Sequence, residues 1–207
     1  MQTPQSPLAR NLGRIAEVVA TDLLVRDAAH PLRPRRARVA LEVRPLTGWA
    51  QRDLVPRERH SRVRTFLLRD DEGFVGLVDG RFAGWVWLSR ASHRDPYSGL
   101  RIRLAPDEAY AYALWVAPGD RPHGVAAVLM TAMLTAVAED PSLSRVYGWV
   151  DRRNRESQVL LRLLGFERVQ EVRRLHLLHR FGRALPASAR PPFGPLSRDG
   201  RHNRSVM

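Results

Sequence analysis

The feature of this sequence that most constrains its fold is an apolar stretch from Ala109 to Glu139, interrupted once by a short polar turn. Its first part, Ala109–Val116 (AYAYALWV), has the composition of a buried strand. The turn Pro118–Gly124 follows, and Val125–Glu139 is an almost entirely apolar run of helix-forming residues. A strand and a helix that are apolar on nearly all sides must both be buried. This segment therefore predicts the centre of a layered α+β domain.

Shorter patterns on either side predict the rest of a mixed sheet. Asp79-Gly80 joins two β-rich runs, which is typical of a hairpin. The expected order of strands and helices gives an α+β fold with a central sheet of about six or seven strands, flanked by helices and containing one parallel crossover. We expect strands at 39–46, 74–78, 81–88, 100–104, 109–116, 145–150, 167–172 and 174–179, and helices at 47–68 (interrupted at Pro56), 125–139 and 155–164.

The two ends of the chain differ from this centre. Asn11–Ala28 has apolar residues at helical spacing and predicts an N-terminal helix, which a proline- and arginine-rich connector, His30–Arg38, follows. Proline, glycine, serine and arginine dominate 183–207, a composition typical of a disordered tail. We therefore divide the chain into an N-terminal helix with its linker (1–38), a central domain (39–182) and the tail.

All basic residues of the chain are arginines. The sequence has 34 arginines and no lysine against 21 acidic residues, a formal net charge of +13. Such a surplus suits an anionic partner, either nucleic acid or a phosphorylated molecule, but GC-rich coding produces the same replacement of lysine. The arginines are spread along the chain, which favours the second explanation. In either case a lysine Schiff base and a lysine general base are excluded.

Several kinds of site are excluded by what the sequence lacks. Without cysteine there is no disulfide, no thiolate nucleophile and no cysteine-ligated metal, and the histidines lack metal-ligand spacing, so we expect no metal. No apolar run approaches the roughly 20 residues of a membrane span. The polar N-terminus does not have the pattern of a secretory signal, so we expect a cytoplasmic protein without a membrane partner.

The turn between the central strand and helix has a pattern suited to phosphate. It reads R-x-x-G-x-A, from Arg121 to Ala126. The first amides of a helix have no acceptor within the helix and lie at the positive end of its dipole, so they can bind a pyrophosphate. Gly124 and Ala126 leave room for the phosphates, while Arg121 and His123 add positive charge. A strand–turn–helix connection that binds no ligand can have the same sequence pattern, so the turn alone leaves the function open.

A second pattern strengthens the first. Thirty-three residues after the arginine of the turn comes Asn154-x-x-Ser157, and Gly165-Phe166 ends the same predicted helix. In order and spacing the chain resembles the GNAT N-acyltransferase superfamily. Its phosphate loop reads Q/R-x-x-G-x-G/A after a strand ending in V-x-P, and its later helix begins N-x-x-S/A and runs out through G-F. The resemblance covers about 39–179 and implies the GNAT fold for the central domain.

The resemblance also implies acyl-CoA, most simply acetyl-CoA, as co-substrate. The backbone of the central strand's end would pair with the pantetheine arm, and the amides at the start of the helix would hold the pyrophosphate. Asn154 would face the pantetheine or thioester, with Ser157 nearby, although asparagine is also a common helix N-cap. The CoA-binding residues implied in this way are Trp115, Val116, Arg121, His123, Gly124, Val125, Ala126, Asn154 and Ser157.

The chain departs from the family pattern at two positions. Pro122 lacks one potential amide donor. Leu161 stands where many members carry a tyrosine, the general acid to the departing thiolate, so this acid is absent or comes from another group or from water. For the general base, the family most often uses a carboxylate on the strand before the phosphate loop or on the next strand. The candidates are Glu108 and Asp151 for the base, and Tyr112, Tyr110 and Tyr147 for the acid.

The expected function is transfer of an acyl group, most simply acetyl, from acyl-CoA to a primary amine of a small molecule, peptide or protein, by direct attack in a ternary complex. One alternative is a GNAT-fold protein that binds acyl-CoA for regulation without efficient catalysis. Another is nucleic-acid binding through Arg33–Arg38 and Arg57–Arg64, but few aromatic residues lie nearby to stack on bases. Exposed strand edges would allow a homodimer.

Overall fold

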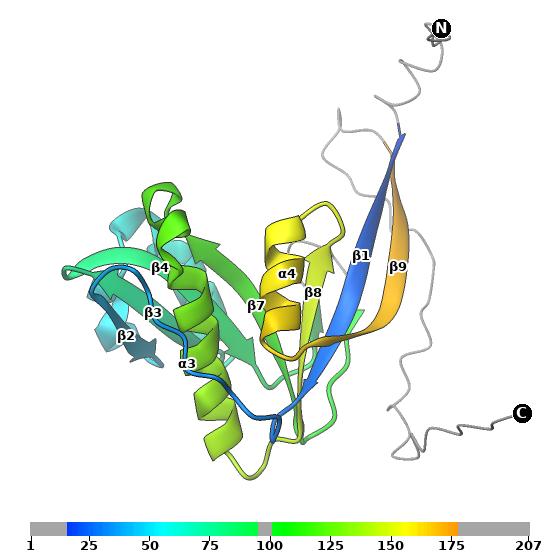
Figure 1. Cartoon of the computed structure of the whole chain (residues 1–207), viewed down its shortest axis with the longest axis horizontal. Coiled ribbons are helices and arrows are strands. Elements are labelled where there is room, and N and C mark those ends of the chain that lie inside the picture. The colour runs from blue at the N-terminus through cyan, green and yellow to red at the C-terminus, as the bar shows by residue number, and fades with distance from the viewer. Residues whose placement is uncertain (1–15, 95–100, 178–207) are drawn as a thin grey trace, which may run out of the picture.

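The fold is built on a mixed sheet of seven strands (Figure 1). The computed structural model describes residues 16–94 and 101–177, so the tail predicted at 183–207 lies outside the described residues. The strands of the sheet are β1 (Ala16–Asp27), β2 (Leu41–Leu46), β3 (Glu72–Val78), β4 (Arg81–Ser89), β7 (Glu108–Val116), β8 (Arg145–Asp151) and β9 (Glu167–Leu177).

The strand order is β2-β3-β4-β7-β8-β1-β9, and only β7 and β8 are parallel within this sheet. The predicted mixed sheet with one parallel crossover is thereby confirmed. The hairpin through Asp79-Gly80 joins β3 to β4. The strand expected at 100–104 is reduced to β6 (Arg101–Ile102), which pairs with β5 (His93–Arg94) in a separate two-stranded ribbon.

Helices cover both faces of the sheet. On one face α3 (Val125–Glu139) and α4 (Arg155–Leu163) pack on the strands and bury an aliphatic core. On the other face α2 (His60–Leu67) packs on an aromatic core that includes Trp85 and Trp87. Two short 3-10 helices, η1 (Trp49–Leu54) and η2 (Arg57–Arg59), precede α2, so the helical region predicted around Pro56 is confirmed. Figure 1 shows α3 and α4 side by side on the same face.

The predicted N-terminal helix at Asn11–Ala28 is wrong. Residues 16–27 form β1, an interior strand that pairs antiparallel with β8 on one edge and with β9 on the other. Leu23 enters the aromatic core and Leu24 the aliphatic core. Because both faces of an interior strand are buried, its apolar residues do not alternate, and over a short window they imitate the spacing of a helix. The sheet therefore includes residues that the sequence assigned to a separate segment.

The prediction of two final strands, 167–172 and 174–179, is also wrong. Residues 167–177 form the single strand β9, which pairs with β1. No glycine, proline or asparagine stands between the two predicted strands to make a turn. Residues 178 and 179 lie outside the described residues.

A buried arginine joins β1 to the end of α4. Arg26 is 1% exposed, and its Nε donates to the carbonyl of Leu164 at 2.8 Å. Its other nitrogens donate to the carbonyl of Asp27 at 2.9 Å and to that of His30. One guanidinium thus satisfies three carbonyls where the strand, the connector and the helix end meet. This contact fixes the course of the chain as it leaves β1.

We expect Arg26→Met to lower the free energy of unfolding by about 2–4 kcal/mol, because the buried carbonyls lose their charged donor. Urea denaturation measures this difference. The matched control is Arg44→Met, which removes an exposed arginine of β2 paired only with Glu42 and should leave stability nearly unchanged. Equal stability of the two variants would contradict the role of Arg26.

Candidate active site

The two parallel strands at the centre of the sheet separate toward their carboxyl ends. β7 and β8 pair only as far as Ala111 and Gly148, although β7 continues to Val116 and β8 to Asp151. Just beyond this point β7 has one residue more than β4 in their pairing, and Ala113 has a φ of 52°. Such a bulge bends and twists a strand. It directs the end of β7 away from β8 and opens a wedge between them.

The end of β7 presents backbone groups to this wedge. The amide of Ala117 donates to the carbonyl of Ala83 at 2.8 Å. Because bonded pairs alternate along an antiparallel ladder, the peptide groups of Trp115 point toward β4, whereas the amide of Val116 points into the wedge. Of the two residues expected to pair with a pantetheine arm, Val116 therefore has the suitable direction.

A tight turn leads from β7 into α3. It consists of a 3-10 helix, η3 (Pro118–His123), and Gly124, whose φ of 77° is left-handed. The amides of Ala127 and Val128 both donate to the carbonyl of Gly124. The amides of Val125 and Ala126 come before the first bonds within the helix, so they are the donors left for a ligand. Glycine is required here because other residues enter this conformation only at a cost of about 1–2 kcal/mol.

Three contacts that sequence reasoning missed hold this turn. Asp120 is buried and accepts two hydrogen bonds from Arg81, at 2.9 and 3.0 Å, and these bonds lower the pKa of Asp120. The Arg38 amide of the connector donates to the carbonyl of His123 at 2.9 Å. Arg121 reaches back to the carbonyl of Val116 at 3.3 Å. Residues far apart in the chain thus fix the turn at the end of the wedge.

Asn154 lies beyond the open end of β8 and caps α4. Its side chain accepts a hydrogen bond from the Ser157 amide at 3.0 Å, so its role as an N-cap is confirmed. One oxygen suffices for the cap, and the exposed side chain keeps its amide nitrogen for another partner. Leu161, seven residues after Asn154, is buried in the aliphatic core. No phenol on this helix can therefore reach the wedge from that position.

Glu108 lies at the closed end of the parallel pair. It accepts hydrogen bonds from the hydroxyl of Tyr147 and from the amide of Ala105, both at 2.9 Å. Burial and the bond to Glu108 raise the pKa of Tyr147 to about 12. Glu108 precedes Tyr112 by four strand residues, about 13 Å. Its carboxylate is therefore remote from the wedge, and its hydrogen bonds hold the closed end of the strand pair together.

Tyr112 belongs to a buried cluster with two residues that sequence reasoning missed. Its hydroxyl donates to Asp71 at 2.6 Å and accepts from Arg69 at 2.6 Å, and Arg69 also binds Asp71 at 2.9 Å. Burial, followed by the bond to Asp71, raises the pKa of Tyr112. Asp71 immediately precedes β3, so the hydroxyl points toward that side of the sheet and away from β8. Asp71 and Arg69 stand in a loop without periodicity, so no sequence signal identified them.

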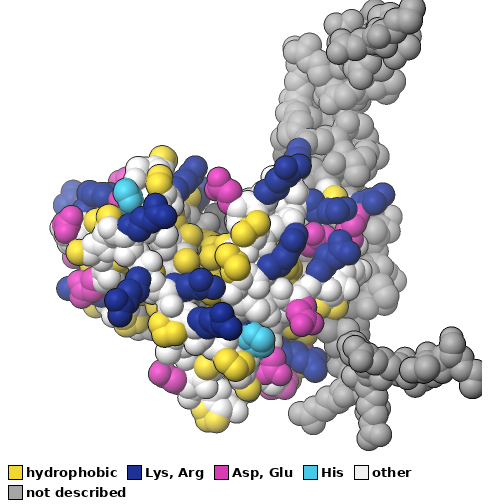
Figure 2. Space-filling view, viewed as in Figure 1, with side chains coloured by type: hydrophobic (Ala, Val, Ile, Leu, Met, Phe, Trp, Pro, Cys, Tyr) yellow, Lys and Arg dark blue, Asp and Glu magenta, His cyan; other side chains and the backbone are white. Residues whose placement is uncertain are grey.

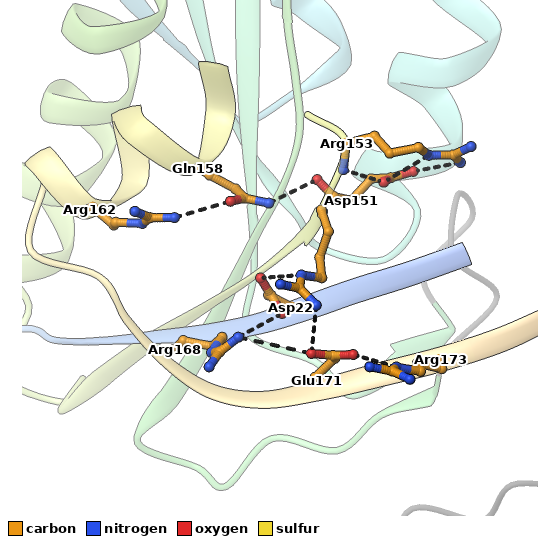
Figure 3. A network of polar contacts seen from close by, with 9 residues as sticks. Asp22, Asp151, Arg153, Gln158, Arg162, Arg168, Glu171 and Arg173 are labelled. Atoms are coloured by element: carbon orange, nitrogen blue, oxygen red, sulfur yellow. Dashed lines mark hydrogen bonds and ion pairs between the residues drawn. The ribbon is translucent and has the colours of Figure 1, made fainter. Parts of the chain in front are cut away.

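Asp151 is the predicted carboxylate that lies at the open end. It is the last residue of β8, and its side chain is 37% exposed. Arg153 contacts it through its guanidinium at 3.1 and 3.3 Å and through its amide at 2.8 Å (Figure 3). These bonds lower the pKa of Asp151. Asp151 therefore stays ionised, with its charge paired to Arg153.

The family model of the acetyltransferase (GNAT) family matches residues 40–166, more than half of the chain. The chain belongs to the GNAT acetyltransferase family. The turn Pro118–Gly124, which we name the phosphate turn after its sequence pattern, and the capped helix α4 lie within the matched residues. The strand β1 precedes the matched residues, although it completes the same sheet.

Solved structures show the same fold at low sequence identity. A GCN5-related N-acetyltransferase from Sphaerobacter thermophilus has a TM-score of 0.56 at 13% identity, over 82% of this chain and 55% of that one. A Drosophila protein has a TM-score of 0.55 at 15% identity, over 83% of this chain and 55% of that one. A GNAT-family protein from Novosphingobium aromaticivorans has a TM-score of 0.52 at 17% identity, over 77% of this chain and 64% of that one. The chain thus spans little more than half to two thirds of these chains. No curated protein matches it in sequence.

The face of this GNAT domain opposite α3 and α4 has an aromatic wall at the end of β7. Phe82 and Trp115 stack with ring centroids 5.7 Å apart, and Trp85 contacts Phe82 edge-on. The guanidinium of Arg59 lies 3.6 Å from the Trp115 ring centroid and 5.2 Å from that of Trp85. Aromatic faces attract cations, so this wall is suited to positively charged groups.

The described part of the chain has neither a cluster of metal-binding side chains nor a helix that could span a membrane. Within residues 16–94 and 101–177, no three or more histidine, aspartate or glutamate side chains lie together in a way that could hold a metal ion. Among the helices of the same ranges, none is long and apolar enough to cross a membrane.

We expect Gly124→Glu to weaken CoA binding by at least about 100-fold, because it places bulk and negative charge beside the donor amides. Isothermal titration with CoA measures the loss. Gly124→Ala is the matched control for backbone strain, since a Cβ here would lie 3.7 Å from the nearest atom, the Arg36 carbonyl oxygen. A folded Gly124→Glu variant with the affinity of the alanine variant would remove the turn from the binding site.

Proposed function

We propose that this GNAT protein transfers the acetyl group of acetyl-CoA to a primary amine of a small molecule, peptide or protein. The observation that carries the proposal is the wedge between β7 and β8, with the first amides of α3 at its end. The amine nitrogen attacks the thioester carbonyl directly. The carbon–sulfur bond breaks, the thiolate leaves and takes up a proton, and the products are an amide and CoA.

The binding of acetyl-CoA is assigned to three groups of residues. The amides of Val125 and Ala126 hold the diphosphate at the positive end of the α3 dipole, and Arg121 and His123 add charge. The amide of Val116 donates to the pantetheine arm or to the thioester. A donor in this place stabilises the negative charge that develops on the carbonyl oxygen during attack.

Asp151 is proposed as the anion that attracts the ammonium form of the acceptor. Its lowered pKa makes it a weak base, so the amine loses its proton to water held by this carboxylate or to solvent. Tyr112 and Tyr147 already donate to carboxylates. A thiolate leaves readily without strong acid assistance, so catalysis rests mainly on orientation and on the backbone donors.

A second candidate function is acyl-CoA binding without efficient turnover. It is favoured by the burial of Leu161 at the usual tyrosine position and by the engagement of Tyr112 and Tyr147 with Asp71 and Glu108. A domain with a complete CoA wedge and no proton donor near the thiolate would serve as a sensor. The two candidates share the ligand and differ in turnover.

Thermal unfolding with acetyl-CoA, followed by thiol release over a panel of amines, tests these functions. At 100 times its dissociation constant the ligand stabilises the fold by about 2.7 kcal/mol, which raises the melting temperature by several degrees. We expect both this shift and thiol release that depends on an amine. Stabilisation without release on any amine would favour the sensor, and neither effect would exclude both candidates.

The pH dependence of the reaction follows from the lowered pKa of Asp151. A carboxylate whose pKa is depressed is ionised above its ordinary value of about 3.9 and is protonated only as the pH falls below it. Asp151 therefore produces no inflection between pH 6 and 9. We expect kcat/KM to rise over this range as the acceptor ammonium loses its proton.

Asp151→Asn should raise KM for a cationic amine about 10-fold, because a charged partner is lost, while the midpoint of the pH profile stays in place. Steady-state kinetics at several pH values measure both quantities. Asp53→Asn, which removes a carboxylate that is 81% exposed, is the matched control. A shifted midpoint in Asp151→Asn would instead identify Asp151 as the titrating base.

A further inference from the structure

A basic pocket lies between the connector and the carboxyl end of α4. Its volume is about 330 Å³, and Arg33, Arg35, Arg162 and His30 line it together with apolar residues and Gly165. No carboxylate is among its lining residues. Its size suits a small ligand, and its charge suits an anion. This pocket is separate from the wedge and none of the sequence patterns indicated it.

The arginines of this pocket keep their charge available. Arg35 donates to the carbonyl of Leu163 at 3.2 Å, and Arg162 donates to the side chain of Gln158 at 3.1 Å (Figure 3). Both partners are neutral. Within the described ranges, no carboxylate forms an ion pair with Arg33, Arg35 or Arg162. By contrast, Arg152, just after β8, and Arg168 on β9 both pair with Asp22. Three guanidinium groups without a carboxylate partner surround one cavity. Such groups bind anions by charge-assisted hydrogen bonds.

The walls of the pocket are held in place by the fold. The buried Arg26 binds the carbonyls of His30 and Leu164, which belong to the two sides of the pocket. A Cβ on Gly165 would lie 2.6 Å from the His30 ring, so glycine is needed for the ring to pack against the helix end. The backbone walls of the pocket are therefore fixed by the fold, while the side chains of Arg33 and Arg162 are exposed at its rim.

The connector brings this pocket close to the phosphate turn. The Arg36 carbonyl oxygen is the nearest atom to a Cβ built on Gly124, at 3.7 Å, and Arg38 bonds to His123. Arg35 is the direct neighbour of Arg36, and Arg33 lies three residues before Arg36, which is at most about 10 Å of extended chain. In Figure 1 the connector runs from the end of β1 across α3 to β2, and Figure 2 shows arginine side chains gathered on this face.

We propose that this pocket binds the 3′-phosphate of CoA. The inference rests on the proposed function, in which the diphosphate of CoA lies at Val125 and Ala126. The remaining phosphate of CoA is a monoester on the ribose next to that diphosphate, and it carries up to two negative charges. The arginines of the pocket bind it, while the apolar lining accommodates part of the adenosine. The pocket therefore makes the protein selective for CoA over dephospho-CoA, which lacks this group.

Isothermal titration of the full chain with CoA and with dephospho-CoA tests the proposal. We expect the wild type to bind CoA at least about 10-fold more tightly, because charge-assisted hydrogen bonds to phosphate have this magnitude or more. Arg33→Gln with Arg162→Gln should reduce CoA affinity to about that of dephospho-CoA, whose own affinity stays unchanged. Arg44→Gln with Arg173→Gln removes the same charge from exposed strand positions and should keep the selectivity.

The outcomes separate this proposal from the function on which it rests. Equal affinities of the wild type for the two ligands would overturn the pocket assignment and leave the acetyl-CoA site standing. Equal losses for both ligands in the Arg33→Gln, Arg162→Gln variant would also overturn it, since a general electrostatic effect does not distinguish them. If neither ligand binds the wild type, the proposed function fails as well. Retained melting temperature confirms that the variant is folded.

Discussion

The site of this protein depends on the separation of β7 from β8 after Ala111 and Gly148. Up to that point two parallel strands satisfy each other's peptide groups, and beyond it they do not. The extra residue in β7, with Ala113 in a left-handed conformation, bends the strand where the separation begins. A strand end freed in this way offers peptide groups to an extended ligand, as another strand would. All other parts of the site are arranged around this opening.

The phosphate turn completes the opening because two distant segments and one local contact hold it. Arg81 on β4 binds the buried Asp120, the connector bonds to His123, and Arg121 closes back onto β7. Donor amides at a helix start are effective only when their direction is fixed in advance. The same connector continues to the basic pocket at the end of α4. One segment thus links the proposed diphosphate site to a second region of positive charge.

Much of the fold could be predicted because its elements have local signals. The hairpin through Asp79-Gly80, the strand Glu108–Val116 and the helix Val125–Glu139 each agree with the patterns that indicated them. The patterns failed for β1, whose burial on both faces removes the alternation by which strands are recognised. At β9 the division into two strands was wrong, because no turn-forming residue stands between the two parts.

The sequence by itself determined the family, the phosphate turn and the cap of α4, because these are properties of short segments whose residue types and spacing are sufficient. The tertiary structure decided which candidate catalytic residues lie near the wedge and which do not. It put Asp151 at the open end, Glu108 at the closed end, and Tyr112 in a buried cluster with Asp71 and Arg69. It also gathered Arg33, Arg35 and Arg162 around one pocket. The position of a charge in space depends on strand order and register, which form only when distant segments pair.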